Sequence, residues 1–271
     1  MNVGFIGMGN MGQMLVTALA RAQVLRPGEL FASTRTLEKL RKLAGSVPQV
    51  TIAYSNRELV QHCPVVFLCI KPGETKAVLE EISPYITPDH LLVTITNTID
   101  IPMIEAVVRA RVAKVIPSVV NSVADGVSLL MFGSRCTPAD VGLLHRLMGA
   151  VSRPFTIEEP QARVCSDLTS CGPAFLSYTF RAMSQAARRY QPDLPAEAVD
   201  AMIRHTAAAT CHLLQQQGLS FDDIIARVST PGGITADGIK VLDEQMAGVW
   251  EQVIETTIVK EEAKKAKVDL I

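Results

Sequence analysis

The chain has 271 residues, of which 48% are hydrophobic and 20% charged, and its formal net charge is −1. This composition provides for a sizeable core and excludes a disordered chain, and the balanced charge argues against nucleic acid or an anionic membrane as a partner. No stretch approaches the roughly 18 uninterrupted apolar residues of a membrane helix. The first residues lack the charged-then-apolar order of a signal peptide, so we expect a cytoplasmic protein.

The first half of the chain alternates short apolar segments with helical patterns. Strands are expected, in chain order, at 3–7, 30–34, 50–54, 65–70, 91–96, 113–118 and 127–132. Helices are expected between most of them, for example up to about Ala22 and from Thr36 to Leu43. Such alternation predicts an α/β fold of the Rossmann type, with a doubly wound, mostly parallel sheet and helices on both of its faces.

After residues 153–161 the pattern is helical to the end of the chain. The expected helices cover 164–190, 195–217, 221–228 and 234–267. We therefore place a domain boundary near Glu159, with a Rossmann-type domain at 1–159 and an all-helical domain at 160–271. The alanine-rich helices are apolar on more than one face, which predicts an obligate homodimer or a higher homo-oligomer.

The six cysteines and five histidines do not form the clusters that bind metals. No two cysteines stand in Cys-x-x-Cys spacing, and most lie among apolar residues, as reduced core thiols do. His205 and His212 share one face of an expected helix, but no third ligand is evident. We therefore expect no metal site.

The segment "GFIGMGNMG" follows the first expected strand and begins a helix. Its glycines Gly7, Gly9 and Gly12 have the G-x-G-x-x-G spacing of a dinucleotide site. In such a site the first glycine permits a tight turn, the second lets the pyrophosphate approach the backbone, and the third lets the helix pack on the strand. The segment predicts a dinucleotide cofactor.

The residues after the second expected strand predict which dinucleotide binds. An NAD site has an acidic residue there, whereas this chain reads "STRT" from Ser33 to Thr36. Hydroxyl groups and the guanidinium of Arg35 suit the 2′-phosphate of NADP(H), which arginine can bind in bidentate fashion. The alternative is a solvated loop arginine.

Two further segments are candidates for ligand contacts. "CIKP" ends the fourth expected strand, where Pro72 holds Lys71 extended, so that its backbone matters more than its amine; an exposed surface lysine is the alternative. "STPGGITADG" (229–238) interrupts an otherwise helical stretch. Its glycines expose N–H groups near a helix start, which suits a carboxylate. Thr235 then either hydrogen-bonds a bound molecule or caps the helix.

These segments resemble the motif series of pyrroline-5-carboxylate reductases over essentially the whole chain. The motifs are "GFIGMGNMG", "SNRELV" (55–60), "CIKP", "CGPAF" and "VSTPGGITADGIKVLDE" (228–244). Members of that family reduce a cyclic imine, pyrroline-5-carboxylate, to proline with NAD(P)H, and their helical domain interlocks with a second subunit. The resemblance implies cofactor contacts from Gly7, Met8, Gly9, Asn10, Met11, Gly12, Ser33, Arg35, Asn56, Cys69, Ile70, Lys71 and Pro72. It implies substrate contacts from Thr230, Gly232, Gly233 and Thr235, of which Thr235 is the candidate catalytic residue.

Three segments depart from the reductase pattern. Proline-asparagine-threonine-proline is replaced by "PSVV" (117–120), and serine-glycine-serine-glycine-proline by "TSCGP" (169–173). The usual double threonine after the two glycines is Ile234-Thr235. These replacements resemble the late-competence (ComER-like) branch of the family.

The sequence is therefore compatible with three functions. The first is an NADPH-dependent reductase of pyrroline-5-carboxylate or a close relative. The second is a reductase-like dinucleotide-binding protein with an altered substrate or a non-catalytic role linked to late competence. The third is a β-hydroxyacid dehydrogenase, whose chemistry needs a lysine early in the long helix, whereas residues 161–193 contain no lysine.

Overall fold

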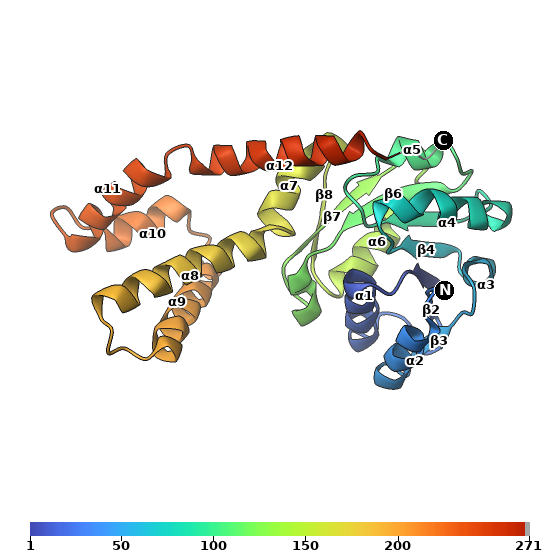
Figure 1. The fold of residues 1–271 in the computed structure, drawn as a ribbon, viewed down its shortest axis with the longest axis horizontal. Coiled ribbons are helices and arrows are strands. Elements are labelled where there is room, and N and C mark those ends of the chain that lie inside the picture. The colour runs from blue at the N-terminus through green and yellow to red at the C-terminus, as the bar shows by residue number, and fades with distance from the viewer. Residues whose placement is uncertain (269–271) are drawn as a thin grey trace. The chain divides into compact units, whose positions relative to one another are not determined.

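The structure is a computed structural model that describes residues 1–268 (Figure 1). Contacts between Cα atoms divide the chain into two compact units. The first contains Met1–Gly172 together with the segment from Thr257, and the second is Pro173–Thr256. Glu159, near which we predict the domain boundary, belongs to the first unit. The chain thus leaves the first unit at Gly172 and re-enters it at Thr257.

The first unit is built on one sheet. Within residues 1–268 the sheet has eight strands in the order β3-β2-β1-β4-β5-β6-β7-β8. Every neighbouring pair is parallel except β6 with β7. The strands are Val3–Ile6 (β1), Leu30–Ser33 (β2), Val50–Ile52 (β3), Val65–Leu68 (β4), Leu91–Thr94 (β5), Arg111–Ile116 (β6), Val127–Phe132 (β7) and Arg153–Thr156 (β8). The predicted mostly parallel sheet of the Rossmann type is confirmed.

Strand β8 is absent from the sequence prediction. It lies at the edge of the sheet, it contains Pro154, and Phe155 is exposed. An edge strand with one free side tolerates proline and needs no alternation of buried residues, so its sequence carries no strand signal.

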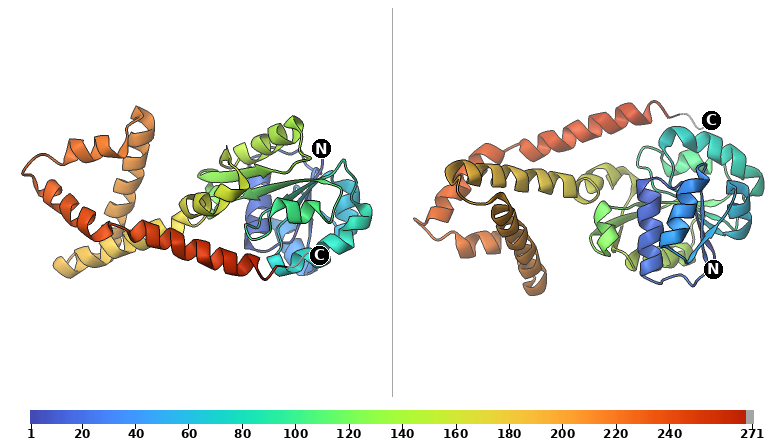
Figure 2. Two further views of the ribbon diagram at one scale, coloured as in Figure 1. Left: turned by 90° about the horizontal axis from the view of Figure 1, so that it is seen from above. Right: turned by 60° about the horizontal axis from the view of Figure 1, so that its bottom comes forward.

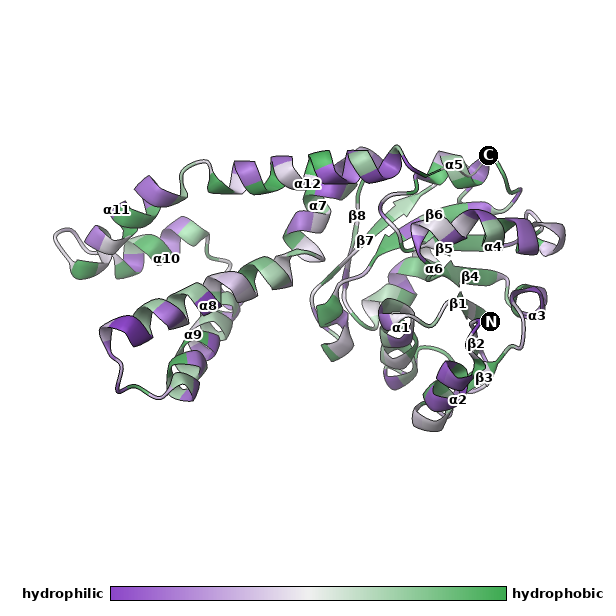
Figure 3. Cartoon of the chain, viewed as in Figure 1, coloured by the Kyte–Doolittle hydropathy of each residue, from purple (hydrophilic) through white to green (hydrophobic). Residues whose placement is uncertain are grey.

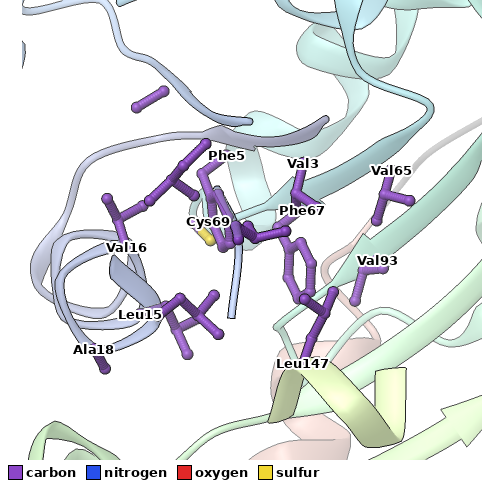
Figure 4. Close-up of a cluster of buried hydrophobic side chains, with 14 of the residues drawn as sticks. Val3, Phe5, Leu15, Val16, Ala18, Val65, Phe67, Cys69, Val93 and Leu147 are labelled. Carbon is purple, nitrogen blue, oxygen red and sulfur yellow. The ribbon is translucent and has the colours of Figure 1, made fainter. Parts of the chain in front are cut away.

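Helices cover both faces of the sheet (Figure 2). Alternate residues of each strand point to opposite faces, so that Phe5 enters one hydrophobic cluster and Ile6 the other. In the first cluster the rings of Phe5 and Phe67 stack with centroids 4.6 Å apart, next to Leu15 of α1 (Figure 4). The helices of the first unit include Asn10–Arg21 (α1), Leu37–Ser46 (α2), Asn56–His62 (α3), Thr75–Ile82 (α4), Ile101–Glu105 (α5), Pro138–Gly149 (α6) and Ala162–Thr169 (α7).

The second unit is helical. Its helices are Gly172–Tyr190 (α8), Ala196–Gln217 (α9), Phe221–Val228 (α10), Ile234–Met246 (α11) and Val249–Lys265 (α12), the last of which continues into the first unit. One helix predicted as continuous is interrupted, because 234–267 breaks at Gly248, whose φ of 74° ends α11. Within 164–190, α8 begins at Gly172, as the pair Gly172-Pro173 predicts.

Few hydrophobic side chains of the second unit are buried. Val199 is the one hydrophobic residue of 173–256 that is buried, whereas large apolar side chains are exposed on all of the helices of this unit. Hydrophobic and hydrophilic residues both occur along these helices (Figure 3). Examples are Leu176, Met202, Phe221, Ile234 and Trp250. An apolar surface of this kind marks an interaction site. Within the described residues no helix is both long enough and apolar enough to cross a membrane.

The last part of α12 is held in the first unit by charged side chains. Arg163 of α7 donates hydrogen bonds to Asp167, at 2.7 Å, and to Glu261 of α12, at 2.8 Å. The Thr257 hydroxyl donates to Asp167 at 2.5 Å, and Lys265 donates to Asp100 at 2.8 Å. Both carboxylates that face Arg163 are buried, so the guanidinium neutralises charge that water does not reach.

Candidate functional site

A cavity of about 500 Å³ lies in the first unit, where β1, β2 and β4 end. The carboxyl ends of parallel strands are where ligands bind in open sheets of this type. The residues that line it are Ile6, Gly7, Met8, Gly9, Thr34, Arg35, Thr36, Lys39, Asn56, Cys69, Ile70, Lys71, Gly73, Glu74, Ala77, Val78 and Glu81. Eight of the predicted cofactor residues are among them: Gly7, Met8, Gly9, Arg35, Asn56, Cys69, Ile70 and Lys71. Asn10, Met11, Gly12, Ser33 and Pro72 are not in the lining.

The three motif glycines differ in what surrounds them. Gly7 has a φ of 98°, and a Cβ there would stand 2.5 Å from the carbonyl oxygen of Cys69. A Cβ on Gly12 would stand 2.1 Å from the carbonyl oxygen of Gly7, so α1 packs directly against the turn. A Cβ on Gly9 would have nothing within 4 Å among the described residues. The structure therefore needs glycine at positions 7 and 12, whereas Gly9 leaves open space in the cavity.

The N-terminus of α1 lies beside this open space. Gly9 is the N-cap residue and lines the cavity, and the helix begins at Asn10. The first N–H groups of a helix have no partner within the helix and carry a partial positive charge. A phosphate group fits this position without any charged side chain.

Ser33 and Asn56 belong to a chain of hydrogen bonds. The buried Ser33 hydroxyl donates to Asn56 Oδ1 at 2.7 Å, and Asn56 Nδ2 donates to Glu81 Oε2 at 2.8 Å. Asn56 lines the cavity with Glu81, whereas Ser33 stands behind it. Ser33 thus orients Asn56, and its own contact with a cofactor stays a prediction.

The loop after β2 carries the predicted phosphate-binding arginine. The side chain of Arg35 is 86% exposed and forms an ion pair with Glu74, which follows β4. Lys39, in the first turns of α2, also lines the cavity. Sequence reasoning missed both residues. Lys39 lies in the first turn of the helix that follows Arg35, so its distance in the chain could have indicated it, whereas nothing in the sequence pairs Glu74 with Arg35.

The "CIKP" segment forms the turn after β4. Lys71 has φ −71° and ψ 151°, which confirms the extended conformation predicted before Pro72. Its N–H donates to Glu74 Oε2 at 3.3 Å, so this backbone group holds the turn. The Cys69 thiol is buried, and burial raises its pKa above the ordinary value, so it stays protonated and lines the cavity as an apolar group.

The predicted substrate loop is a turn followed by α11, in the second unit. Gly233 N–H donates to the carbonyl of Thr230 at 2.8 Å, and Gly232 has a φ of 75°. Proline followed by glycine with positive φ is typical of a type II turn. Pro231, expected at a helix start, therefore lies in the turn, and the Gly233 N–H, expected to be exposed, closes it. The N–H groups of Ile234 and Thr235, in the first turn of α11, have no partner among residues 1–268.

Thr235 stands at the second position of α11. The N-cap residue is Gly233, so the interpretation of Thr235 as the helix cap is wrong. Its side chain is exposed, and its hydroxyl has no hydrogen-bond partner among residues 1–268. A hydroxyl with no structural partner beside two free N–H groups is available to a ligand. The contacts of Thr230, Gly232, Gly233 and Thr235 with a substrate stay predictions.

Two of the segments that depart from the reductase pattern touch one another in the first unit. The Ser118 hydroxyl, in "PSVV", donates to the carbonyl of Thr169, in "TSCGP", at 3.1 Å. Ser118 is fully buried. The replacements therefore alter one place in the fold rather than two independent ones.

Comparisons with known proteins agree with this geometry. Residues 2–98 match the family model "NADP oxidoreductase coenzyme F420-dependent", and residues 159–264 match "Pyrroline-5-carboxylate reductase dimerisation". The chain is 31% identical to ComE operon protein 4 of Bacillus subtilis, over 97% of this chain and 96% of that protein. It is 29% identical to pyrroline-5-carboxylate reductase 3 of Bacillus subtilis, over 96% of this chain and 95% of that protein.

A solved structure shows the same fold. The pyrroline carboxylate reductase of Plasmodium falciparum with NADP bound superposes with a TM-score of 0.80 at 20% identity, over 97% of this chain and 96% of that one. With both units matched and a relative above 30% identity along nearly its whole length, the fold and the lineage are settled. The chain belongs to the pyrroline-5-carboxylate reductase family, in the branch that contains ComE operon protein 4.

Proposed function

We propose that the chain is an NADPH-dependent reductase of a cyclic imine, which converts pyrroline-5-carboxylate to proline. The observation that carries the proposal is the cavity at the ends of β1, β2 and β4, lined by Gly7, Gly9 and Arg35. Its open space at Gly9 suits a pyrophosphate, and Arg35 suits a 2′-phosphate. The NADP bound to the Plasmodium falciparum protein supports the choice of cofactor. The name of the Bacillus subtilis pyrroline-5-carboxylate reductase 3 supports the choice of substrate.

In that reaction the residues of this chain need only bind and orient the substrate and the cofactor. When bound, NADPH supplies a hydride to the imine carbon, and the nitrogen keeps the proton that makes the imine electrophilic. No strong general acid is required, so a hydroxyl near the ring nitrogen is sufficient. In this proposal the protonated ring nitrogen donates a hydrogen bond to the Thr235 hydroxyl oxygen, and the N–H groups at the start of α11 bind the substrate carboxylate.

A second candidate function is a dinucleotide-binding protein of the same fold with another substrate or no catalysis, linked to late competence. The contact between Ser118 and Thr169 favours it, because both replaced segments meet there. The similarity to ComE operon protein 4 supports the same alternative. For either function we expect a cytoplasmic protein.

The assay that separates the two follows NADPH oxidation at 340 nm with pyrroline-5-carboxylate as the substrate, and proline as the product. The first proposal requires proline in amounts equal to the NADPH consumed. Tight binding of NADPH without turnover would instead favour the second candidate.

Arg35 is expected to determine cofactor choice. Replacing it with alanine should weaken NADPH by about 1.5–3 kcal/mol, which is the value of a hydrogen bond to a charged group, and should leave NADH nearly unchanged. Dissociation constants from fluorescence titration of both cofactors test this. Equal losses for NADPH and NADH would refute the 2′-phosphate assignment.

We also expect a homodimer or a larger homo-oligomer. Residues 173–256 bury one hydrophobic side chain, Val199, and match a dimerisation family, so their exposed apolar surface needs a partner. Light scattering at micromolar concentration should give at least twice the mass of one chain, which is 29.3 kDa. A monodisperse monomer would contradict the prediction.

A further inference from the structure

The carboxylate of Glu74 joins two walls of the cofactor cavity. Glu74 ends the short turn Pro72–Glu74 after β4, and its two oxygens have different partners. Oε1 accepts a hydrogen bond from Arg35 Nη2, and Oε2 accepts one from the Lys71 N–H. All three residues line the cavity. Glu74 therefore links the loop after β2 to the turn after β4.

This ion pair occupies the group that the proposed function assigns to the 2′-phosphate of NADPH. Glu74 is a fixed negative charge in contact with the guanidinium of Arg35. A phosphate on the same guanidinium would lie closer to this carboxylate than the Debye length of about 8 Å at physiological salt. The two anions would therefore repel one another with little screening.

We propose that Glu74 is a specificity-determining residue that lowers the preference of this chain for NADPH over NADH. It holds Arg35 when no 2′-phosphate is present, and it repels the phosphate when Arg35 binds it. The inference rests on the proposed binding of the 2′-phosphate by Arg35.

The opposite effect, in which Glu74 improves NADPH binding by orienting Arg35, is the weaker of the two. The side chain of Arg35 is 86% exposed, and an ion pair in water restrains such a side chain very little. A 2′-phosphate carries nearly two negative charges, so its repulsion from the carboxylate exceeds the small gain from orientation.

The test is Glu74→Gln, with Glu80→Gln as the matched control. Glutamine keeps an oxygen that accepts the Lys71 N–H, so the turn is retained while the charge is removed. Glu80 is exposed on α4, it does not line the cavity, and its replacement changes the net charge equally. Dissociation constants for NADP⁺ and NAD⁺ are measured by calorimetry, and melting temperatures confirm that each variant is folded.

We expect Glu74→Gln to tighten NADP⁺ by about three- to tenfold and to change NAD⁺ by less than about twofold. Glu80→Gln should change neither. In a chain that already carries Arg35→Ala, Glu74→Gln should gain less for NADP⁺ than it gains in the wild type. Unchanged or weaker NADP⁺ binding by Glu74→Gln, or an equal gain from Glu80→Gln, would overturn the inference.

These binding measurements keep the inference separate from the proposed function. If Arg35→Ala lowers NADP⁺ affinity selectively while Glu74→Gln has no effect, the role of Glu74 alone is refuted. If Arg35→Ala weakens both cofactors equally, the 2′-phosphate assignment and the inference both fail. A lack of turnover with pyrroline-5-carboxylate would refute the proposed reduction. It would not change the ratio of the NADP⁺ and NAD⁺ affinities on which the inference about Glu74 depends.

Discussion

Gly12→Ala should unfold or severely weaken the first unit, whereas Gly9→Ala should leave it folded and abolish most of its cofactor affinity. A Cβ on residue 12 meets a backbone oxygen at 2.1 Å, which a side-chain rotation does not relieve, so we expect a loss of about 3 kcal/mol or more in unfolding free energy. Residue 9 has a φ of −75° and open space around it, so alanine should change stability by less than about 0.5 kcal/mol. Its methyl group would occupy the space for the pyrophosphate and weaken NADPH by about 10–100-fold.

Thermal unfolding and NADPH titration on the same preparations test both variants. Gly142→Ala is the control, because Gly142 lies within α6 with nothing near its Cβ position among the described residues. Alanine there should stabilise the helix by about 0.5–1 kcal/mol and leave binding unchanged. A normally stable Gly12→Ala protein would contradict the packing of α1 on the Gly7 turn. Normal NADPH affinity in Gly9→Ala would place the pyrophosphate elsewhere.

Thr235→Val should lower turnover and leave stability and NADPH affinity intact. Valine nearly conserves the shape of threonine but removes the hydroxyl group. Because Gly233 is the N-cap residue of α11, no helix-capping contact is lost, and the melting temperature should stay near the wild-type value. If the hydroxyl bonds the ring nitrogen in the transition state, turnover with pyrroline-5-carboxylate should fall by about 10–100-fold.

Thr235→Ser is the matched variant, since serine keeps the hydroxyl group. It should retain most of the wild-type turnover in a steady-state assay. Equal rates for the valine variant and the wild type would remove Thr235 from the reaction. If neither protein turns over while both still bind NADPH, the non-catalytic alternative is favoured.

The fold was predictable where the chain has strong local patterns. The seven predicted strands are present because each is a short apolar segment between helical patterns, and their ends differ by only a few residues. Edge strand β8 is too short and too exposed to carry such a pattern. The break at Gly248 was missed because a single glycine in a helical pattern does not reveal that its φ is positive.

In the candidate site, too, features that depend on neighbouring residues were predictable, and contacts between residues far apart in the chain were not. The G-x-G-x-x-G spacing is local and gave the turn at Gly7 and the close contact at Gly12. Pro231-Gly232 is typical of a type II turn, but a proline before a helical pattern is equally typical of a helix start, so the sequence does not indicate the hydrogen bond of Gly233. Arg35 and Glu74 are 39 residues apart, and only the parallel order β2-β1-β4 brings the ends of their strands to one cavity.

The course of the chain through the two units has a consequence for how the protein loses its structure. Residues 173–256 are preceded and followed in the chain by segments of the first unit, in which Asp167 binds Thr257 and Arg163 binds Glu261. The second unit is thus an insertion whose two ends are held by hydrogen bonds within the first unit. As long as these hydrogen bonds are formed, the unfolded second unit is a closed loop. Closing a loop lowers the conformational entropy of the unfolded chain. The hydrogen bonds of Thr257 and Glu261 therefore stabilise the folded helices of the second unit without contacting them.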